Sequence, residues 1–147
     1  MIQEFRTITL FKAKKPKDPD LNQALQWFST SLGLFGERDK EKSCFRIFVE
    51  LVKAARYKKA LTSDQLAARA NLSRATVIHH LKRLIAADMV TVEKNQYALR
   101  TENLEDLVKE IQTETARVFH DLKDMAEELD EQLGLGKRDR KAHVISD

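Results

Sequence analysis

The chain has 147 residues, of which 42% are hydrophobic and 33% are charged, and its formal net charge is +3 at pH 7. This length suits one domain, or one small domain with an appendage, and a single cysteine, Cys44, excludes an internal disulfide and a thiolate-rich metal site. Neither an apolar run of about 18 residues nor a signal peptide is recognisable, so we expect no membrane segment and a cytoplasmic protein.

Residues 1–17 are expected to form an N-terminal arm. Phe5–Phe11 alternates loosely and is rich in Thr, Ile and Phe, which allows a short strand. The basic run Lys12–Lys17 contains too few apolar residues to fold by itself. It is either a solvated linker or a mobile arm that touches phosphate.

Two helices are expected next. Asp18-Pro19 predicts the start of the first, because aspartate caps helices and proline suits their first turn. That helix ends at Gly33 and has an apolar face of Leu21, Ala24, Leu25, Phe28 and Leu32, with Trp27 beside it as a packing residue.

The second helix is predicted from about Asp39 to Tyr57. Its buried face comprises Cys44, Ile47, Phe48, Leu51, Val52 and Ala55, and Arg56, Lys58 and Lys59 follow it. Those three cations either favour the helix C-terminus or touch phosphate.

The stretch from Leu61 to Val90 predicts two short helices separated by a tight turn. Thr62 and Gln65 have the spacing of a capping box, and Asn71 suits a left-handed turn. Ser73 is the expected N-cap of the second helix. From there Val77, Leu81, Leu84 and Ile85 recur at helical spacing and face a core.

A hairpin is expected directly after these helices. Val90 and Val92, then Tyr97 and Leu99, alternate on either side of Lys94-Asn95, which predicts a turn at or near Asn95. A hairpin in this place is a wing. Its tip carries Lys94 and its base Arg100, so its contribution to phosphate binding should be modest.

Residues 102–133 predict one long helix with a heptad repeat. The repeat consists of Leu104, Val108, Ile111, Thr115, Val118, Leu122, Met125 and Leu129. We expect a second copy to cover this stripe, although folding back onto helices 18–32 and 39–57 is an alternative. Residues 1–101 carry 19 Lys and Arg against 10 Asp and Glu, whereas 102–133 carry 3 against 11. A basic body with an acidic helix points to a polyanion partner for the body.

The stretch Leu72–Leu84, followed by Ala87–Val90, resembles the recognition helix and following turn of ArsR-type winged-helix repressors. The shared pattern is a Leu-Ser start, then Val, then His-His-Leu-Lys; at the entry into the wing this chain has Met89-Val90 in place of Leu-Val. Asp88 replaces the usual turn glycine, which its tolerance of the left-handed region allows. The family's Cys-Val-Cys metal box falls on Thr62-Ser63-Asp64, which has no thiolate, so no thiophilic metal is expected there. His120 and Asp124 match only a fragment of another metal site of the family.

The helix predicted over residues 73–87, which follows the tight turn, has an outward face suited to the major groove of double-stranded DNA. Arg74 can pair with guanine, Thr76 and His79 can hydrogen-bond to base edges, and Ala75 or Ile78 can contact a thymine methyl. Lys82 and Arg83 are better placed for phosphate, and the amides of the helix N-terminus lie near Ser73. His80 is expected to point partly into the domain. The expected DNA-binding residues are Ser73, Arg74, Ala75, Thr76, Ile78, His79, Lys82, Arg83 and Lys94.

The sequence thus predicts a mainly α fold, a winged helix-turn-helix with a short β-hairpin wing and a long C-terminal dimerisation helix. The expected segments are a basic arm over 1–17, a DNA-binding domain over 18–100, a dimerisation helix over 101–134 and a flexible tail over 135–147. The expected dimer contacts are Leu104, Val108, Ile111, Val118, Leu122, Met125 and Leu129.

The leading functional hypothesis is a homodimeric, sequence-specific transcriptional regulator. The alternatives are an architectural, chromatin-like DNA binder and a winged-helix protein–protein interaction module. No enzyme activity, cofactor or metal is expected, because no carboxylate pair, Cys/His constellation or phosphate-cradling glycine loop stands out. The pattern does not identify an effector.

Overall fold

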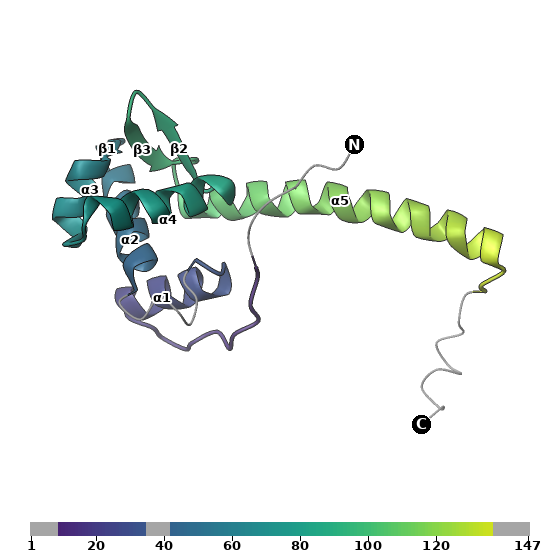
Figure 1. The fold of residues 1–147 in the computed structure, drawn as a ribbon. Helices are drawn as coiled ribbons and strands as arrows, with labels where there is room; N and C mark the ends of the chain where they lie inside the picture. The colour runs from purple at the N-terminus through teal and green to yellow at the C-terminus, as the bar shows by residue number, and fades with distance from the viewer. Residues whose placement is uncertain (1–8, 35–41, 137–147) are drawn as a thin grey trace. The chain divides into compact units, whose positions relative to one another are not determined.

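The computed structural model describes residues 9–34 and 42–136. The chain forms two units, Met1–Leu107 and Val108–Asp147. Within the described ranges the elements are α1 (Leu21–Ser31), α2 (Ser43–Ala55), β1 (Leu61–Thr62), α3 (Ser63–Ala70), α4 (Arg74–Ala86), β2 (Val90–Glu93), β3 (Gln96–Leu99) and α5 (Leu104–Leu133) (Figure 1). The predicted fold class is confirmed: the chain is mainly helical, with a small antiparallel wing and a long C-terminal helix. No helix in these ranges is both long and apolar enough to cross a membrane.

Helix α1 begins two residues later than predicted. Asp20, rather than Asp18, is its N-cap: the Asp20 carboxylate accepts from the Gln23 amide at 2.7 Å, and the Gln23 side chain accepts from the Asp20 amide at 3.0 Å. Asp18 has a φ of 46°, which differs from the extended backbone of a cap. Leu21 is 78% exposed, so its predicted place on the buried face was wrong. Gly33 follows the helix with a φ of 67°, as expected for the residue that ends it.

The N-terminal arm is described only from Thr9. The predicted strand Phe5–Phe11 therefore lies mostly outside the described residues, and Thr9–Phe11 has no assigned strand. The Phe11 amide donates to the Ser31 carbonyl at 2.9 Å, and the Trp27 indole N–H donates to the Ala13 carbonyl at 3.3 Å. These two bonds attach the start of the described chain to α1.

The core of the first unit is organised around α2. Cys44, Ile47, Phe48 and Leu51 are buried as predicted, whereas Val52 and Ala55 are only half-buried because Phe45 and Ala54 occupy the inner positions instead. The other fully buried large side chains are Leu66, Val77, Leu81, Leu84, Met89 and Leu107. Helix α2 begins at Ser43, after Lys42; the predicted first turn, from Asp39, lies outside the described residues.

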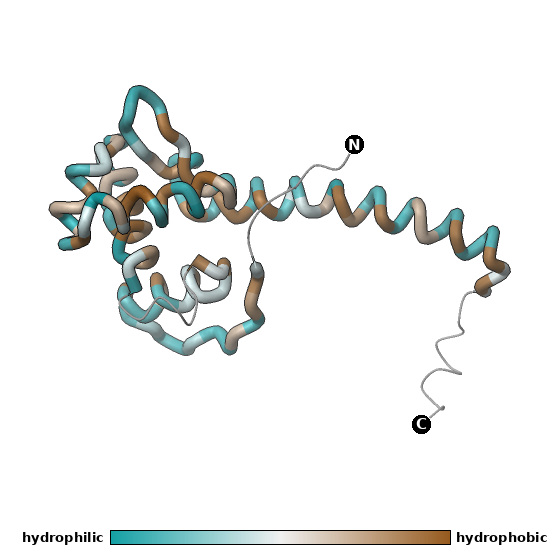
Figure 2. The backbone as a smooth tube through the Cα atoms, in the orientation of Figure 1, coloured by the Kyte–Doolittle hydropathy of each residue, from teal (hydrophilic) through white to brown (hydrophobic). Residues whose placement is uncertain are grey.

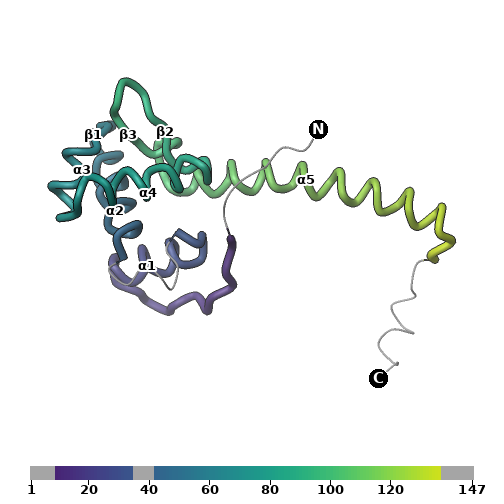
Figure 3. The backbone as a smooth tube through the Cα atoms, in the orientation of Figure 1, coloured from purple at the N-terminus to yellow at the C-terminus, as the bar shows by residue number. Residues whose placement is uncertain are grey.

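The sheet has three strands in the order β1-β3-β2, all antiparallel. The predicted hairpin is confirmed: Val90 pairs with Leu99 and Glu93 with Gln96, and the chain turns at Lys94 and Asn95 (Figure 3). Both turn residues have positive φ, 51° and 63°, as a two-residue hairpin turn of type I′ requires. The two-residue strand β1 pairs with β3 and was not predicted.

Helix α5 has 30 residues. It begins at Leu104, because the side chain of Asn103 accepts from the Asp106 amide at 2.7 Å and donates to the Asp106 carboxylate at 3.0 Å. Gly134 follows its last residue with a φ of 70°, a conformation that suits the residue after a helix. Hydrophobic and hydrophilic segments alternate along its length at helical spacing (Figure 2).

Candidate nucleic-acid interface

Two capped helices and the turn between them form the candidate site. Thr62 caps α3 through the predicted capping box: its hydroxyl accepts from the Gln65 amide at 3.1 Å, and the Gln65 side chain accepts from the Thr62 amide at 2.9 Å. Asn71 ends α3 in the left-handed conformation, with a φ of 54°. Ser73 then caps α4, because its hydroxyl accepts from the Thr76 amide at 3.2 Å. The local chemistry predicted for the turn is therefore present.

The turn is also held from α2 by Arg46, a residue whose role was not predicted from the sequence. Its guanidinium donates to the Ala70 carbonyl and, at 3.1 Å, to the Asn71 carbonyl. These are the last carbonyls of α3, which have no partner within the helix. The only sequence signal for this role was a cation between two apolar residues, Phe45 and Ile47, near the start of α2.

Helix α4 separates its residues onto an inner and an outer face. Val77, Leu81 and Leu84 are buried, and Ile85 is half-buried. His80 is 8% exposed, in agreement with its expected inward direction, and its ring lies 5.2 Å from that of His79. The packing of this inner face fixes which residues face solvent.

The outer face contains the residues predicted to contact DNA. Ser73, Arg74, Ala75, His79, Lys82 and Arg83 are exposed, and Thr76 and Ile78 are half-exposed. The hydroxyl of Ser73 also donates to the Thr76 hydroxyl at 2.9 Å, so Thr76 belongs to the cap as well as to this face. Around the first two turns the face thus offers one guanidinium, one imidazole, two hydroxyls and two apolar side chains.

Arg74 has an acidic neighbour. Its Nε atom lies 3.6 Å from a carboxylate oxygen of Asp64 on α3, and the two side chains are 70% and 77% exposed. An exposed ion pair of this kind is worth at most about 1 kcal/mol. Asp64 therefore orients Arg74 weakly and leaves it able to exchange this contact for another.

The wing contributes one cation at its tip and one at its base. Lys94 is exposed. Arg100 is held near the end of α4: its guanidinium lies 3.1 Å from the Asp88 carboxylate, and its amide donates to the Met89 carbonyl at 3.0 Å. Asp88 has a φ of 59°, so the left-handed conformation expected for it is confirmed.

The positions that correspond to metal ligands in ArsR-type repressors are occupied here by residues with other contacts. Thr62 is engaged in the α3 cap, Ser63 is buried and Asp64 pairs with Arg74. His120 Nε2 lies 3.4 Å from the Asp124 carboxylate, with both side chains largely exposed. Among the residues that the structure describes, no group of three or more His, Cys, Asp or Glu side chains could hold a metal ion.

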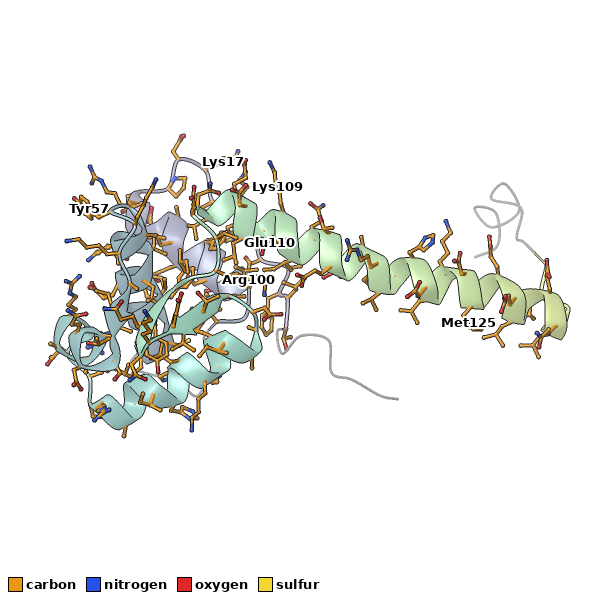
Figure 4. All side chains as sticks on the ribbon, turned by 90° about the horizontal axis from the view of Figure 1, so that it is seen from above. Lys17, Tyr57, Arg100, Lys109, Glu110 and Met125 are labelled. Carbon is orange, nitrogen blue, oxygen red and sulfur yellow. The ribbon has the colours of Figure 1, made fainter. Side chains whose placement is uncertain are left out.

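The apolar stripe of α5 is mostly exposed. Of the residues predicted to mediate dimerisation, Leu104 is half-buried and Ile111 is buried within the single chain, whereas the others are 38–58% exposed: Val108, Val118, Leu122, Met125 and Leu129. Phe119 and Leu133 add to this stripe with 64% and 67% exposure. Figure 4 shows the Met125 side chain projecting from the helix. Large apolar side chains exposed in a continuous row mark an interaction surface.

Comparison with known proteins identifies one segment. Residues 41–93 match the model of a family described as "Helix-turn-helix domain". This segment includes α2, α3, α4 and β2, and therefore the complete outer face described above. No curated protein and no solved structure gives a significant match.

Proposed function

Because residues 41–93 are a helix-turn-helix domain of the ArsR type, a DNA-binding element of transcriptional regulators, we propose that this chain is a dimeric, sequence-specific regulator that binds double-stranded DNA. In this proposal α4 enters the major groove. Regulators with such a domain are typically not enzymes, and the proposal assigns no catalytic role to any residue.

One observation carries the proposal: the exposed first turns of α4 begin at a capped helix N-terminus and hold Arg74, Ala75 and His79 outward. A helix of this size fits the major groove, where each base pair displays a distinct pattern of donors and acceptors. Arg74 suits the O6 and N7 atoms of guanine, and Lys82 and Arg83, a turn or more further along, suit phosphate.

The proposed dimer rests on α5. Its row of exposed Val, Leu, Met and Phe side chains repeats at heptad spacing, which suits packing against the same helix of a second copy. Two copies related by a two-fold axis would present two α4 helices to successive major grooves, roughly 34 Å apart. The preferred DNA site should then be a pseudo-palindrome.

The test separates base reading from phosphate binding. Sites are first selected from random duplex DNA. With the selected site, Arg74→Ala should reduce discrimination at one base position of each half-site by about 1–3 kcal/mol, because it removes a bidentate contact. Lys82→Ala should instead weaken binding to all sequences alike and lower the salt dependence by about one counterion per protomer. Fluorescence anisotropy with single-base variants of the site at two salt concentrations measures both effects.

Lys123→Ala, which removes the same charge from α5, is the control and should leave base discrimination unchanged. Equal affinity of the wild-type chain for the selected site and for random duplex would contradict sequence-specific reading. A uniform loss of affinity from Arg74→Ala would favour an architectural binder instead.

A further inference from the structure

A pocket of about 510 Å³ lies at the C-terminal end of α2, away from the helix-turn-helix turn. It is formed by the loop after α2, over residues 55–60, and by the end of β3 with the loop that follows, over residues 98–103. All of these residues belong to the first unit. A volume of this order accommodates a small organic ligand.

The charged groups around the pocket are mostly cationic. Arg56, Lys58, Lys59 and Arg100 line it, against a single carboxylate, that of Glu102. The neutral part of the lining is apolar at Ala55, Ala60, Ala98 and Leu99, and polar at Thr101 and Asn103. Several cations beside an apolar wall suit an organic molecule that carries more than one negative group.

The loop that supplies three of the cations has a defined conformation. The amides of Tyr57 and Lys59 both donate to the Ala54 carbonyl, at 3.0 and 3.1 Å, and the Lys58 amide donates to the Ala55 carbonyl at 3.0 Å. Lys58 has a φ of 55°, and the Arg56 guanidinium lies 5.5 Å from the centre of the Tyr57 ring. Figure 4 labels Tyr57, which belongs to this loop, and Arg100, which follows β3 and lines the pocket. A fixed loop reduces the entropy lost when a ligand is bound.

We propose that this pocket binds a small organic anion with at least two carboxylate or phosphate groups. The cations could also serve DNA phosphate, but the pocket lies far from the turn that opens α4. Arg46, which holds that turn, precedes Ala55 by nine residues of α2, a separation of about 14 Å along the helix. The N-terminus of α5 is not the anion site, because Asn103 already caps it.

One lining residue joins the pocket to the end of α4. Arg100 contacts the Asp88 carboxylate at 3.1 Å, and its amide donates to the Met89 carbonyl; these partners are the second and third residues after the C-terminal end of α4. A bound anion competes with Asp88 for the Arg100 guanidinium. It thereby weakens the contact between Arg100 and the segment that follows α4. The anion then changes the DNA affinity of the chain, and DNA changes its anion affinity by the same factor. This regulatory step, unlike the anion site itself, rests on the proposed DNA binding.

Anion binding is tested first without DNA. The full chain, labelled with ¹⁵N, is titrated with citrate, glycerol 3-phosphate and pyrophosphate, with ionic strength held constant by sodium chloride. At least one anion should cause saturable amide shifts centred on residues 55–60 and 98–103. Lys59→Gln should weaken that binding by about fivefold or more, because it removes one pocket cation.

Lys53→Gln is the matched control. Lys53 also lies on α2 and is 66% exposed, but it pairs with Glu50 and does not line the pocket. Its substitution should leave anion affinity unchanged. The proposal is overturned if none of the three anions saturates, if the two variants lose affinity equally, or if the saturable shifts centre on residues 73–79, which would indicate phosphate binding by α4.

Coupling is tested on the DNA site selected above. The bound anion should change DNA affinity by about fivefold at constant ionic strength. Asp88→Asn should abolish this change while the pocket shifts persist, because asparagine tolerates the left-handed backbone but does not compete as a charge. An unchanged anion effect in Asp88→Asn would refute the coupling. If the wild-type chain binds no duplex at low salt, the proposed function fails, whereas the NMR titration still decides the anion site.

Discussion

Replacing Leu122 and Leu129 together by lysine should convert the chain from a dimer of about 34 kDa to a monomer of 17.0 kDa. Both side chains belong to the exposed heptad row of α5, at 58% and 47% exposure in the single chain. Removing a leucine from a packed interface costs about 2–5 kcal/mol, and burying an ammonium group in its place adds to that cost. Dimerisation should weaken by at least about thirtyfold for each leucine that is replaced. Sedimentation equilibrium over a range of concentrations measures the effect.

His120→Lys is the control for added positive charge. Residue 120 lies two positions from Leu122, about 200° round the helix, and a lysine there can keep the pairing with Asp124. This variant should remain dimeric. A wild-type chain that sediments as a monomer at every concentration would refute the proposed dimer, and the double variant would then behave like the wild type.

Phe48→Ala should strongly destabilise the first unit. Phe48 is 0% exposed, and its ring stacks on that of Phe28 from α1, with 6.3 Å between the ring centroids. Truncation removes the central side chain of α2 together with its contact to α1, at a cost of about 3–5 kcal/mol. For a unit of this size the Tm should fall by at least about 12 °C. Thermal unfolding followed by circular dichroism measures it.

Phe119→Ala tests whether this loss reflects burial. Phe119 is 64% exposed on α5, so the same truncation there should leave the unfolding of the first unit unchanged and affect only self-association. A Tm for Phe48→Ala within a few degrees of the wild-type value would contradict the assignment of Phe48 to the centre of the core.

The parts of the fold that were predicted well depend on local chemistry. The Thr62/Gln65 capping box, the left-handed turn at Asn71, the Ser73 cap and the hairpin turn at Lys94-Asn95 involve residues at most three apart. Such local patterns can be recognised in the sequence without knowledge of the rest of the fold. The sequence also placed the outward residues of α4 correctly, because helical periodicity fixes one face once the other is buried.

The parts that were missed depend on contacts between distant residues. Strand β1 has only two residues, too few to show alternation, and exists because Leu61 and Thr62 pair with Tyr97 and Gln96. The Arg46 contacts with Ala70 and Asn71 span more than twenty residues. The start of α1 was misplaced for a different reason: Asp18 and Asp20 are both good caps, and only Asp20 is matched three residues later by a glutamine that completes the box.

The residue at position 88 indicates whether a related chain can form the ion pair with Arg100. A glycine at this position would also accept the φ of 59° and end α4, but it would have no carboxylate for Arg100. Two chains could therefore share the whole fold and the same reading helix while differing in whether the pocket communicates with it. The residues at positions 88 and 100 can be read directly from a sequence. They would distinguish chains in which an ion pair joins the pocket to the end of α4 from chains that have no such ion pair.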